Sequence, residues 1–306
     1  MSKTNVIAIL CADIHLTLNP PMWRSAEPDW LEAQKRPLLE LCSLQEKYEC
    51  PVICAGDIFD KWNSPPELIN FALAYLPDMI AIPGQHDLPQ HNLDNIKKSA
   101  FWTLIEAHKI TWLNNTQEYS KGLWIRGFPF GVKVTPQPNK LKEELNIALI
   151  HQYVWTENAK YQTASPDCHI KAQKDILQTY DICVFGDNHI SFNTKLKNTQ
   201  ICNCGSLMRR HSDQINYKPR VGLLQTDGQI VLHYLDISKD KYIRTTKKDD
   251  NINESSDMAE FFEELESLGQ TSLDFKEYIK QWMQDNKKTK KQVKEIIIKA
   301  MENGKD

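Results

Sequence analysis

Short apolar runs alternate with helix-like stretches through the first third of the chain, and this alternation restricts the fold more than any other feature. Residues 5–12, 51–57 and 79–84 have the apolar composition of buried strands. Residues 27–48, 65–76 and 96–109 carry apolar side chains at helical spacing. Strands that alternate with helices pair in parallel, and the helices cover the faces of their sheet. The pattern therefore predicts an α/β fold made of βαβ units.

The second half of the chain is richer in strand-like segments. They are residues 122–130, 146–154, 181–189, 199–206, 220–228 and 229–237. Asp227 and Gly228 separate the last two and are typical of a hairpin turn. We expect these strands to form a second sheet, mixed or antiparallel, that packs against the first.

The composition changes after residue 237, which indicates three parts. Residues 1–237 would form the main domain, residues 238–257 a charged linker, and residues 258–306 a C-terminal helical region. The helices of the last part have apolar stripes that need a partner. That partner would be the main domain, a second copy of the chain or another protein.

Bulk composition narrows the class of protein. The chain has 306 residues, 41% of them hydrophobic, with a net charge of -3 and a pI of about 6.3, so a nucleic-acid site would need a local basic patch. We expect neither a membrane span nor a leader peptide, and the eight cysteines are scattered along the sequence. We expect reduced, buried thiols and a cytoplasmic protein.

Polar side chains follow five of the expected strands at the point where each strand ends. In chain order they are Asp13 and His15, Asp57, then Gln85, His86 and Asp87, then His151, and finally Asp187 and His189. Ligand sites in open α/β sheets lie at the carboxyl ends of the strands. Asp and His side chains together suit divalent cations such as Mn²⁺, Mg²⁺ or Fe²⁺, and the number of candidates implies two ions.

The ordered segments "ADIH", "AGDIFD", "PGQHD", "IHQ" and "GDNH" resemble the signature of the calcineurin-like metallophosphoesterase superfamily over roughly residues 5–235. The resemblance implies a four-layer α/β (α+β) sandwich of two mixed sheets flanked by helices, with the C-terminal helices as an appendage. Within the superfamily, "GDIFDKW" and "NCGSLMRR" look similar to the SbcD-type DNA repair nucleases and their phage-encoded relatives.

The resemblance also implies a role for each residue. The first metal would be held by Asp13, His15 and His189, and Asp57 would bridge both ions. The second would be completed by Gln85, His151 and Asp187. A metal-bridged hydroxide would attack phosphorus, while His86, oriented by Asp87, would protonate the leaving oxygen.

Two positions depart from the family pattern, and both belong to the second metal. Gln85 stands where the family has Asn, and Asp187 stands where the family has the first His of its last motif. Both changes favour oxygen ligands, so we expect Mn²⁺ above Mg²⁺ or Fe²⁺, and a preference over Zn²⁺. The alternative is a weakened second site.

Substrate contacts are expected from basic residues in two loops. Arg209 and Arg210 follow "GSLM", and His91 follows the third strand. These would bind phosphates if their loops reach the metal edge, and otherwise the arginines form a solvated charged loop. Trp23 and Trp62 would stack on bases or pack at the rim of the site.

Three functions are compatible with the sequence. The first is a two-metal DNA nuclease, an exonuclease or a structure-specific endonuclease of recombination, repair or replication. The resemblance then implies DNA as partner, a homodimer and an SbcC-like ATPase bound through the C-terminal helices. The second is a phosphodiesterase or phosphatase of nucleotides or other small molecules, and the third is a non-catalytic adaptor.

Overall fold

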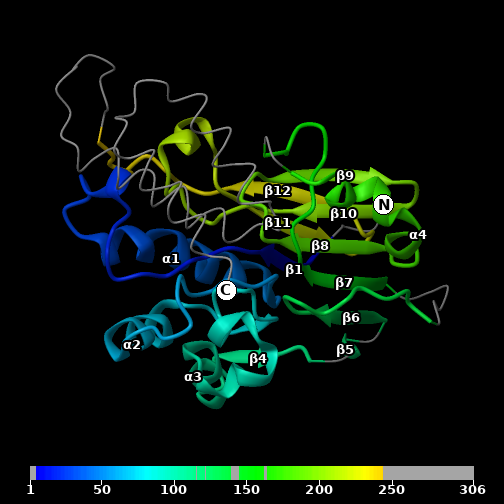
Figure 1. Ribbon diagram of the computed structural model, residues 1–306, viewed down its shortest axis with the longest axis horizontal. Coiled ribbons are helices and arrows are strands. Elements are labelled where there is room, and N and C mark those ends of the chain that lie inside the picture. Colours follow the sequence, from blue (N-terminus) through cyan, green and yellow to red (C-terminus); the bar gives the residue numbers. More distant parts are fainter. Residues whose placement is uncertain (1–4, 115, 121, 139–144, 162–163, 244–306) are drawn as a thin grey trace, which may run out of the picture. The chain divides into compact units, whose positions relative to one another are not determined.

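The computed structural model describes residues 5–114, 116–120, 122–138, 145–161 and 164–243, and within them the strands form two six-stranded sheets (Figure 1). The C-terminal helices predicted at 258–306 and most of the predicted linker lie outside the described residues. No described helix has the length and apolar character that a membrane crossing requires.

The first sheet has the strand order β12-β11-β1-β2-β3-β4. Its strands are β1 (Val6–Cys11), β2 (Val52–Cys54), β3 (Met79–Ala81), β4 (Ile110–Trp112), β11 (Arg220–Gln225) and β12 (Ile230–Tyr234). Strands β1 to β4 run parallel, as the βαβ pattern predicts. The assignment of β11 and β12 to the second sheet was wrong, because β11 pairs antiparallel with β1. That pairing satisfies backbone groups that β1 would otherwise expose as an edge strand.

The second sheet is mixed and has the strand order β5-β6-β7-β8-β10-β9. Its strands are β5 (Thr116–Ser120), β6 (Leu123–Phe128), β7 (Leu145–His151), β8 (Ile182–Gly186), β9 (Phe192–Leu196) and β10 (Thr199–Asn203). The four central strands are parallel, and β5 and β9 pair antiparallel at the two edges. The sequence did not predict β4, β5 or β9, which are only three to five residues long.

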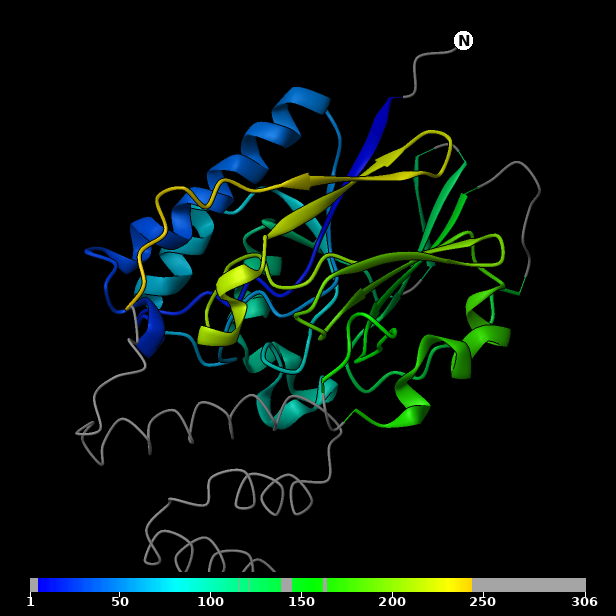
Figure 2. The same ribbon diagram turned by 90° about the horizontal axis from the view of Figure 1, so that it is seen from above.

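Side chains of the central strands alternate between two cores because successive residues of a strand point to opposite faces. In β1, Ala8 and Leu10 face the second sheet, whereas Ile9 and Cys11 face the helices. The core between the sheets therefore draws on both of them, and the view from above shows the sheets facing each other (Figure 2). The predicted α/β sandwich is confirmed.

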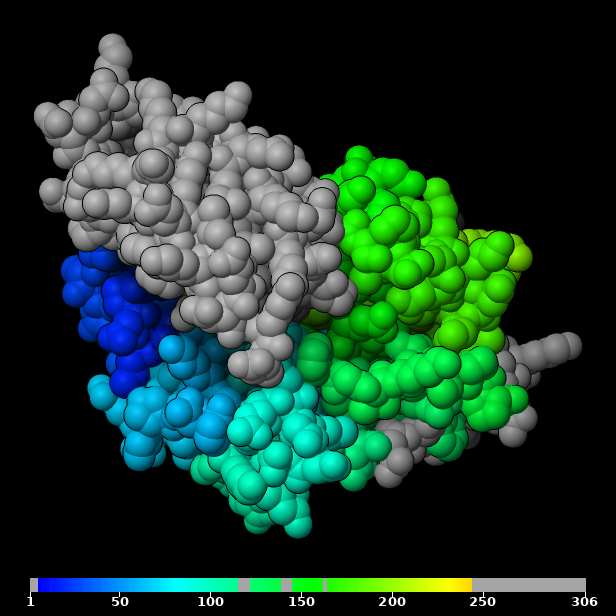
Figure 3. Space-filling model, in the orientation of Figure 1, coloured from blue at the N-terminus to red at the C-terminus, as the bar shows by residue number. Residues whose placement is uncertain are grey.

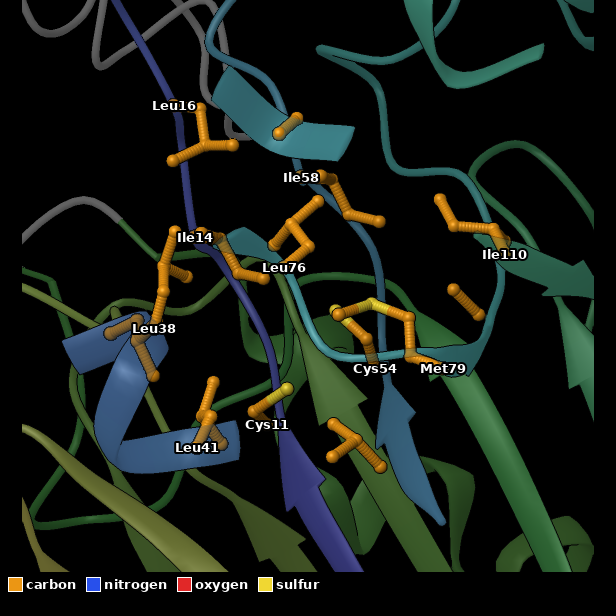
Figure 4. Packing of buried hydrophobic residues seen from close by; sticks show 14 of the residues in the cluster. Cys11, Ile14, Leu16, Leu38, Leu41, Cys54, Ile58, Leu76, Met79 and Ile110 are labelled. Carbon is orange, nitrogen blue, oxygen red and sulfur yellow. The ribbon is translucent and has the colours of Figure 1, made fainter. Parts of the chain in front are cut away.

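Three helices cover the outer face of the first sheet, namely α1 (Trp30–Tyr48), α2 (Pro66–Tyr75) and α3 (Ala100–Glu106). Leu38 and Leu41 of α1 pack beside Cys11 and Ile14 in this core (Figure 4). The segments of α2 and α3 form the light-blue and cyan surface in Figure 3. The helix predicted at 96–109 is divided, because a 3-10 helix over Leu93–Lys98 ends at Ser99, which caps α3.

The outer face of the second sheet is covered by shorter segments. They are the 3-10 helix Ile170–Gln173 and α4 (Lys174–Leu177), whose Ile170 and Leu177 pack against Ile150 and Phe185 of the sheet. The described chain therefore has four layers. None of the eight cysteines, which all lie in the described chain, is paired in a disulfide.

Candidate metal centre

The strand-end loops that carry the candidate ligands have a restricted backbone. Asp13, His15, Asp57 and Asp187 all have positive φ, between 50° and 78°, a region that residues with a Cβ rarely occupy. Such conformations cost of order 1–3 kcal/mol each and gather at functional sites. The fold thus maintains four strained residues at one place, where their side chains are needed.

Glycines before three of these loops allow the backbone to approach the ligands closely. A Cβ added at Gly84 would lie 2.0 Å from Asp57 Oδ1, and one at Gly56 would lie 2.4 Å from His151 Nδ1. A Cβ at Gly186 would lie 2.4 Å from the carbonyl oxygen of Ala55. Side chains at these positions would displace Asp57 and His151, so the glycines of "AGD", "PGQHD" and "FGDNH" shape the site.

One half of the cluster joins β1 to the loop after β8. Nε2 of His15 lies 3.1 Å from Nε2 of His189, and Asp13 completes a group whose ligand atoms lie within 4.8 Å of one another. Burial lowers the pKa of His15 to about 4 and that of His189 well below its usual value. Both rings are therefore neutral at pH 7, and a nitrogen of each points toward the other. We call Asp13, His15 and His189 the first half.

The other half joins the ends of β2, β3, β7 and β8. His151 Nδ1 donates to the carbonyl oxygen of Ala55 (2.5 Å), so Nε2 faces the site, where Gln85 Oε1 lies 2.6 Å away. Gln85 Nε2 donates to Asp187 Oδ1 (2.9 Å). Burial lowers the pKa of His151, but nearby carboxylates, Asp57 first, outweigh it and raise the value to about 10. We call Gln85, His151 and Asp187 the second half.

Asp57 lies between the two halves. Its Oδ2 is 3.7 Å from His15 Nε2 and 3.4 Å from His151 Nε2, and its Oδ1 accepts the backbone N–H of His86 (3.0 Å). The side chain is fully buried. Asp57 Oδ2 thus faces one imidazole of each half. This position is suited to a residue that two ions would share.

The donor set fits divalent cations. Asp13 Oδ2 and Asp57 Oδ2 are buried and have no hydrogen-bond partner among the described residues. A buried carboxylate oxygen without a donor is costly unless a cation neutralises it. Three candidate ligand groups lie among the described residues, namely Asp13, His15 and His189, then His15, Asp60 and His86, and lastly Asp13, Asp57 and His151. Gln85 Oε1 adds a neutral oxygen to the last of these groups.

His86 stands beside the cluster with one nitrogen anchored. Its Nδ1 donates to the carbonyl oxygen of Asp60 (2.7 Å), its buried Nε2 has no partner in the described chain, and its ring contacts the His15 ring edge-on at 4.8 Å. Sequence reasoning assigned no role to Asp60. Its carboxylate lies 3.6 Å from His15 Nδ1, and the only signal in the sequence is its place in "GDIFD".

The expected contact between Asp87 and the His86 imidazole is not found. The Asp87 carboxylate instead accepts the backbone N–H groups of Ile58, Phe59 and Gly84 at 3.0–3.3 Å. It therefore joins the loop after β2 to the loop after β3. A carboxylate that accepts three N–H bonds has little capacity left for an imidazole, and the Asp60 carbonyl takes that place.

The two neighbouring arginines point to different partners. Arg210 Nη1 lies 2.7 Å from Asp60 Oδ1 and so reaches the metal edge. Arg209 binds Asp240 (2.9 Å), in a buried network with Arg24, so the prediction that Arg209 contacts substrate is not supported. Asp240 lies in the segment predicted as linker, whose described start is packed on the domain.

The remaining predicted contacts lie at the rim or away from it. The exposed His91 packs its ring 5.9 Å from that of Phe130, which is 6.5 Å from the His151 ring. Trp23 is buried and stacked on Tyr242, so it is not available to a base. Trp62 is partly buried in the loop that precedes α2.

Fold and cluster together define a candidate centre for two divalent cations at the carboxyl ends of the strands of an α/β sandwich. The model of the family called calcineurin-like phosphoesterase matches residues 8–191, which is more than half of the chain. The chain belongs to this family and is a metallophosphoesterase. Among proteins with curated functions, none matches it significantly.

Solved structures resemble the chain at low identity. A putative 5'-nucleotidase from Staphylococcus aureus is 12% identical, with a TM-score of 0.46 over 84% of this chain and 57% of that one. An archaeal phosphodiesterase is 12% identical, with a TM-score of 0.39 over 74% and 99%. A metallophosphoesterase from Sphaerobacter thermophilus is 14% identical, with a TM-score of 0.36 over 76% and 89%.

Proposed function

We propose that the protein is a two-metal phosphodiesterase that cleaves DNA. The observation that carries the proposal is a contact between the two segments that resemble SbcD-type nucleases. Asp60 belongs to "GDIFDKW" and Arg210 to "NCGSLMRR", and their side chains pair at 2.7 Å beside the candidate metal centre. These segments are separated by about half of the chain, so their meeting at the site supports a shared role.

When bound, two divalent ions supply an activated water and neutralise charge on the phosphate. Asp13, His15 and His189 would hold one ion, and Gln85 and His151 the other, with Asp57 between them and Asp187 hydrogen-bonded to Gln85. We propose Mn²⁺ as the native ion, with Mg²⁺ or Fe²⁺ as substitutes, because the second half is rich in oxygen atoms.

His86 supplies the proton in this proposal. Because Nδ1 donates to the Asp60 carbonyl, the proton that is given to a leaving oxygen must come from Nε2. Nε2 is buried and has no partner in the described chain. A positioned general acid contributes about 10²–10⁴-fold to the rate.

Arg210 is proposed to contact a phosphate next to the scissile one. Its guanidinium is already at the metal edge through Asp60, and guanidinium groups bind phosphate oxygens through paired N–H donors. His91 would reach the same substrate from the rim. A homodimer and an SbcC-like ATPase at residues 258–306 stay predictions.

The test is Mn²⁺-dependent digestion of end-labelled single-stranded and double-stranded DNA, with His86→Ala as the paired variant. We expect cleavage by the unchanged protein, a rate about 10²–10⁴-fold lower for His86→Ala, and equal metal content in both. The product ladder then gives the polarity. Equal rates for both proteins would contradict the role of His86.

A small-molecule phosphoesterase is the second candidate, and the net charge of -3 favours it over a DNA enzyme. Hydrolysis of bis-p-nitrophenyl phosphate or nucleotides without cleavage of DNA would replace the nuclease by this activity. An adaptor without activity would bind no Mn²⁺ when metal content is measured by mass spectrometry.

A further inference from the structure

The two residues that depart from the family pattern contact each other. Gln85 follows β3 in the first sheet and Asp187 follows β8 in the second, 102 positions apart, yet Gln85 Nε2 donates to Asp187 Oδ1 at 2.9 Å. Both side chains are buried, at 1% and 5% exposure. The two side chains therefore form a buried hydrogen bond within the second half.

The carboxylate determines which way the Gln85 amide faces. An ionised carboxylate oxygen can only accept, so the amide must turn its NH₂ group to Asp187. The amide oxygen is then directed away from Asp187, and Oε1 lies 2.6 Å from His151 Nε2. The reverse orientation would place an oxygen lone pair against the carboxylate of Asp187, which is repulsive.

Asp187 is itself fixed by the first half. Its backbone N–H donates to Asp13 Oδ1 (3.0 Å), and its φ of 78° restricts the loop after β8. Asp187 also belongs to none of the three candidate ligand groups. One of its two oxygens is already used by Gln85.

We propose that Asp187 is a positioning residue of the second half. Asp187 acts on a divalent cation through Gln85 and is not itself a ligand of that cation. Asp187 holds the amide of Gln85 in place. The cation would then be bound by three atoms, Gln85 Oε1, His151 Nε2 and Asp57 Oδ2. Binding of the cation by Gln85 therefore depends on Asp187. This inference rests on the two-metal site of the proposed function.

The test reverses the hydrogen bond while the charge of the pair stays the same. Gln85→Glu combined with Asp187→Asn moves the carboxylate to position 85 and the amide to position 187, so the donor is now at position 187. Each single substitution breaks the pair, because Gln85→Glu opposes two carboxylates and Asp187→Asn leaves either amide orientation open.

Mn²⁺ binding is measured by calorimetry and by mass spectrometry after desalting, together with the electron-spin signal of a coupled Mn²⁺ pair. We expect each single variant to bind the second ion about 10–100-fold more weakly, as changes behind a metal ligand do. The double variant should return to within about threefold of the unchanged protein. Binding of the first ion serves as the internal control and should not change.

Additive losses in the double variant would overturn the inference and make Asp187 a direct ligand. No loss in Asp187→Asn would overturn it as well, because the amide would then need no support. If a single variant does not fold, NMR of the unchanged protein provides the test. The Gln85 NH₂ resonances should then be protected from solvent exchange, and unprotected resonances would overturn the inference. Metal binding that follows this pattern without any cleavage of DNA would reject the nuclease proposal alone.

Discussion

His15 of the first half and His151 of the second half are equally buried, yet the pKa values of the two histidines shift in opposite directions. In the first half, burial dominates and lowers the pKa of His15 to about 4. In the second half, the carboxylates of Asp57, Asp187 and Asp13 outweigh burial and raise the pKa of His151 to about 10. Burial wins at His15, where Asp60 and Asp57 favour a charge but His86 and Arg210 oppose it, whereas the carboxylates around His151 all favour a charge.

The two halves would therefore take up a cation in different ways. The first half has neutral imidazoles that are ready to share lone pairs with a metal ion. The second half already holds a proton on His151, so an ion that binds there must displace it. The halves meet at Asp57, which faces both.

The largest effect is expected from Asp57→Asn, because this change removes the charge that both halves share. Loss of several kcal/mol of electrostatic stabilisation of the transition state corresponds to a phosphodiesterase rate roughly 10³-fold lower. Both ions should also bind more weakly. Phosphodiesterase rates and bound Mn²⁺ per chain check this. The exposed Asp94 gives a matched control as Asp94→Asn. If only one ion were lost, Asp57 would belong to one half and the comparison would fail.

The site could be predicted further from the sequence than the fold around it. The residues Asp13, His15, Asp57, His151 and His189 lie at or just after the ends of apolar strands, and the ends of parallel strands gather at one sheet edge. The pattern of polar residues at strand ends therefore predicted which side chains lie together in the candidate centre. It did not predict that β11 and β12 extend the first sheet, because pairing of β11 with β1 depends on residues more than 200 positions apart.

Contacts behind the candidate ligands were the least predictable part. Asp87 was expected at His86 because it is adjacent in sequence, but neighbouring side chains in a loop do not have to face each other. Asp60 and Arg210 pair across 150 positions, and neither residue carries a local signal of that pairing. Such contacts follow from how the two sheets pack, which no single segment of the sequence encodes.

A second prediction concerns the protein after treatment with a chelator. A raised pKa on His151 stabilises the folded state fully below the unfolded pKa of 6.5, and this contribution is lost as pH rises toward 10. Stability should therefore fall between pH 7 and pH 10, by an amount on the order of a few kcal/mol. Urea unfolding at several pH values measures this fall.

Two controls sharpen the prediction for the second half. His151→Gln should remove most of the alkaline loss, since no imidazole remains to release the proton. Saturating Mn²⁺ should do the same, because an ion takes the place of the proton. A stability that is independent of pH from 7 to 10 in the chelated protein would mean that His151 is neutral, like the histidines of the first half.

The smallest effect should separate the neighbouring arginines. Arg210→Ala removes a cation next to the first half, so we expect weaker DNA binding at all sequences and a salt dependence reduced by about one phosphate contact. Arg209→Ala should leave DNA binding unchanged and lower the free energy of unfolding by about 1–3 kcal/mol, because Asp240 loses a buried partner. Binding titrations at several salt concentrations and urea unfolding of both variants give the two readouts. If Arg209→Ala weakened DNA binding as much as Arg210→Ala, both arginines would act as one charged surface. The ion pair with Asp60 would then give Arg210 no separate role in DNA binding.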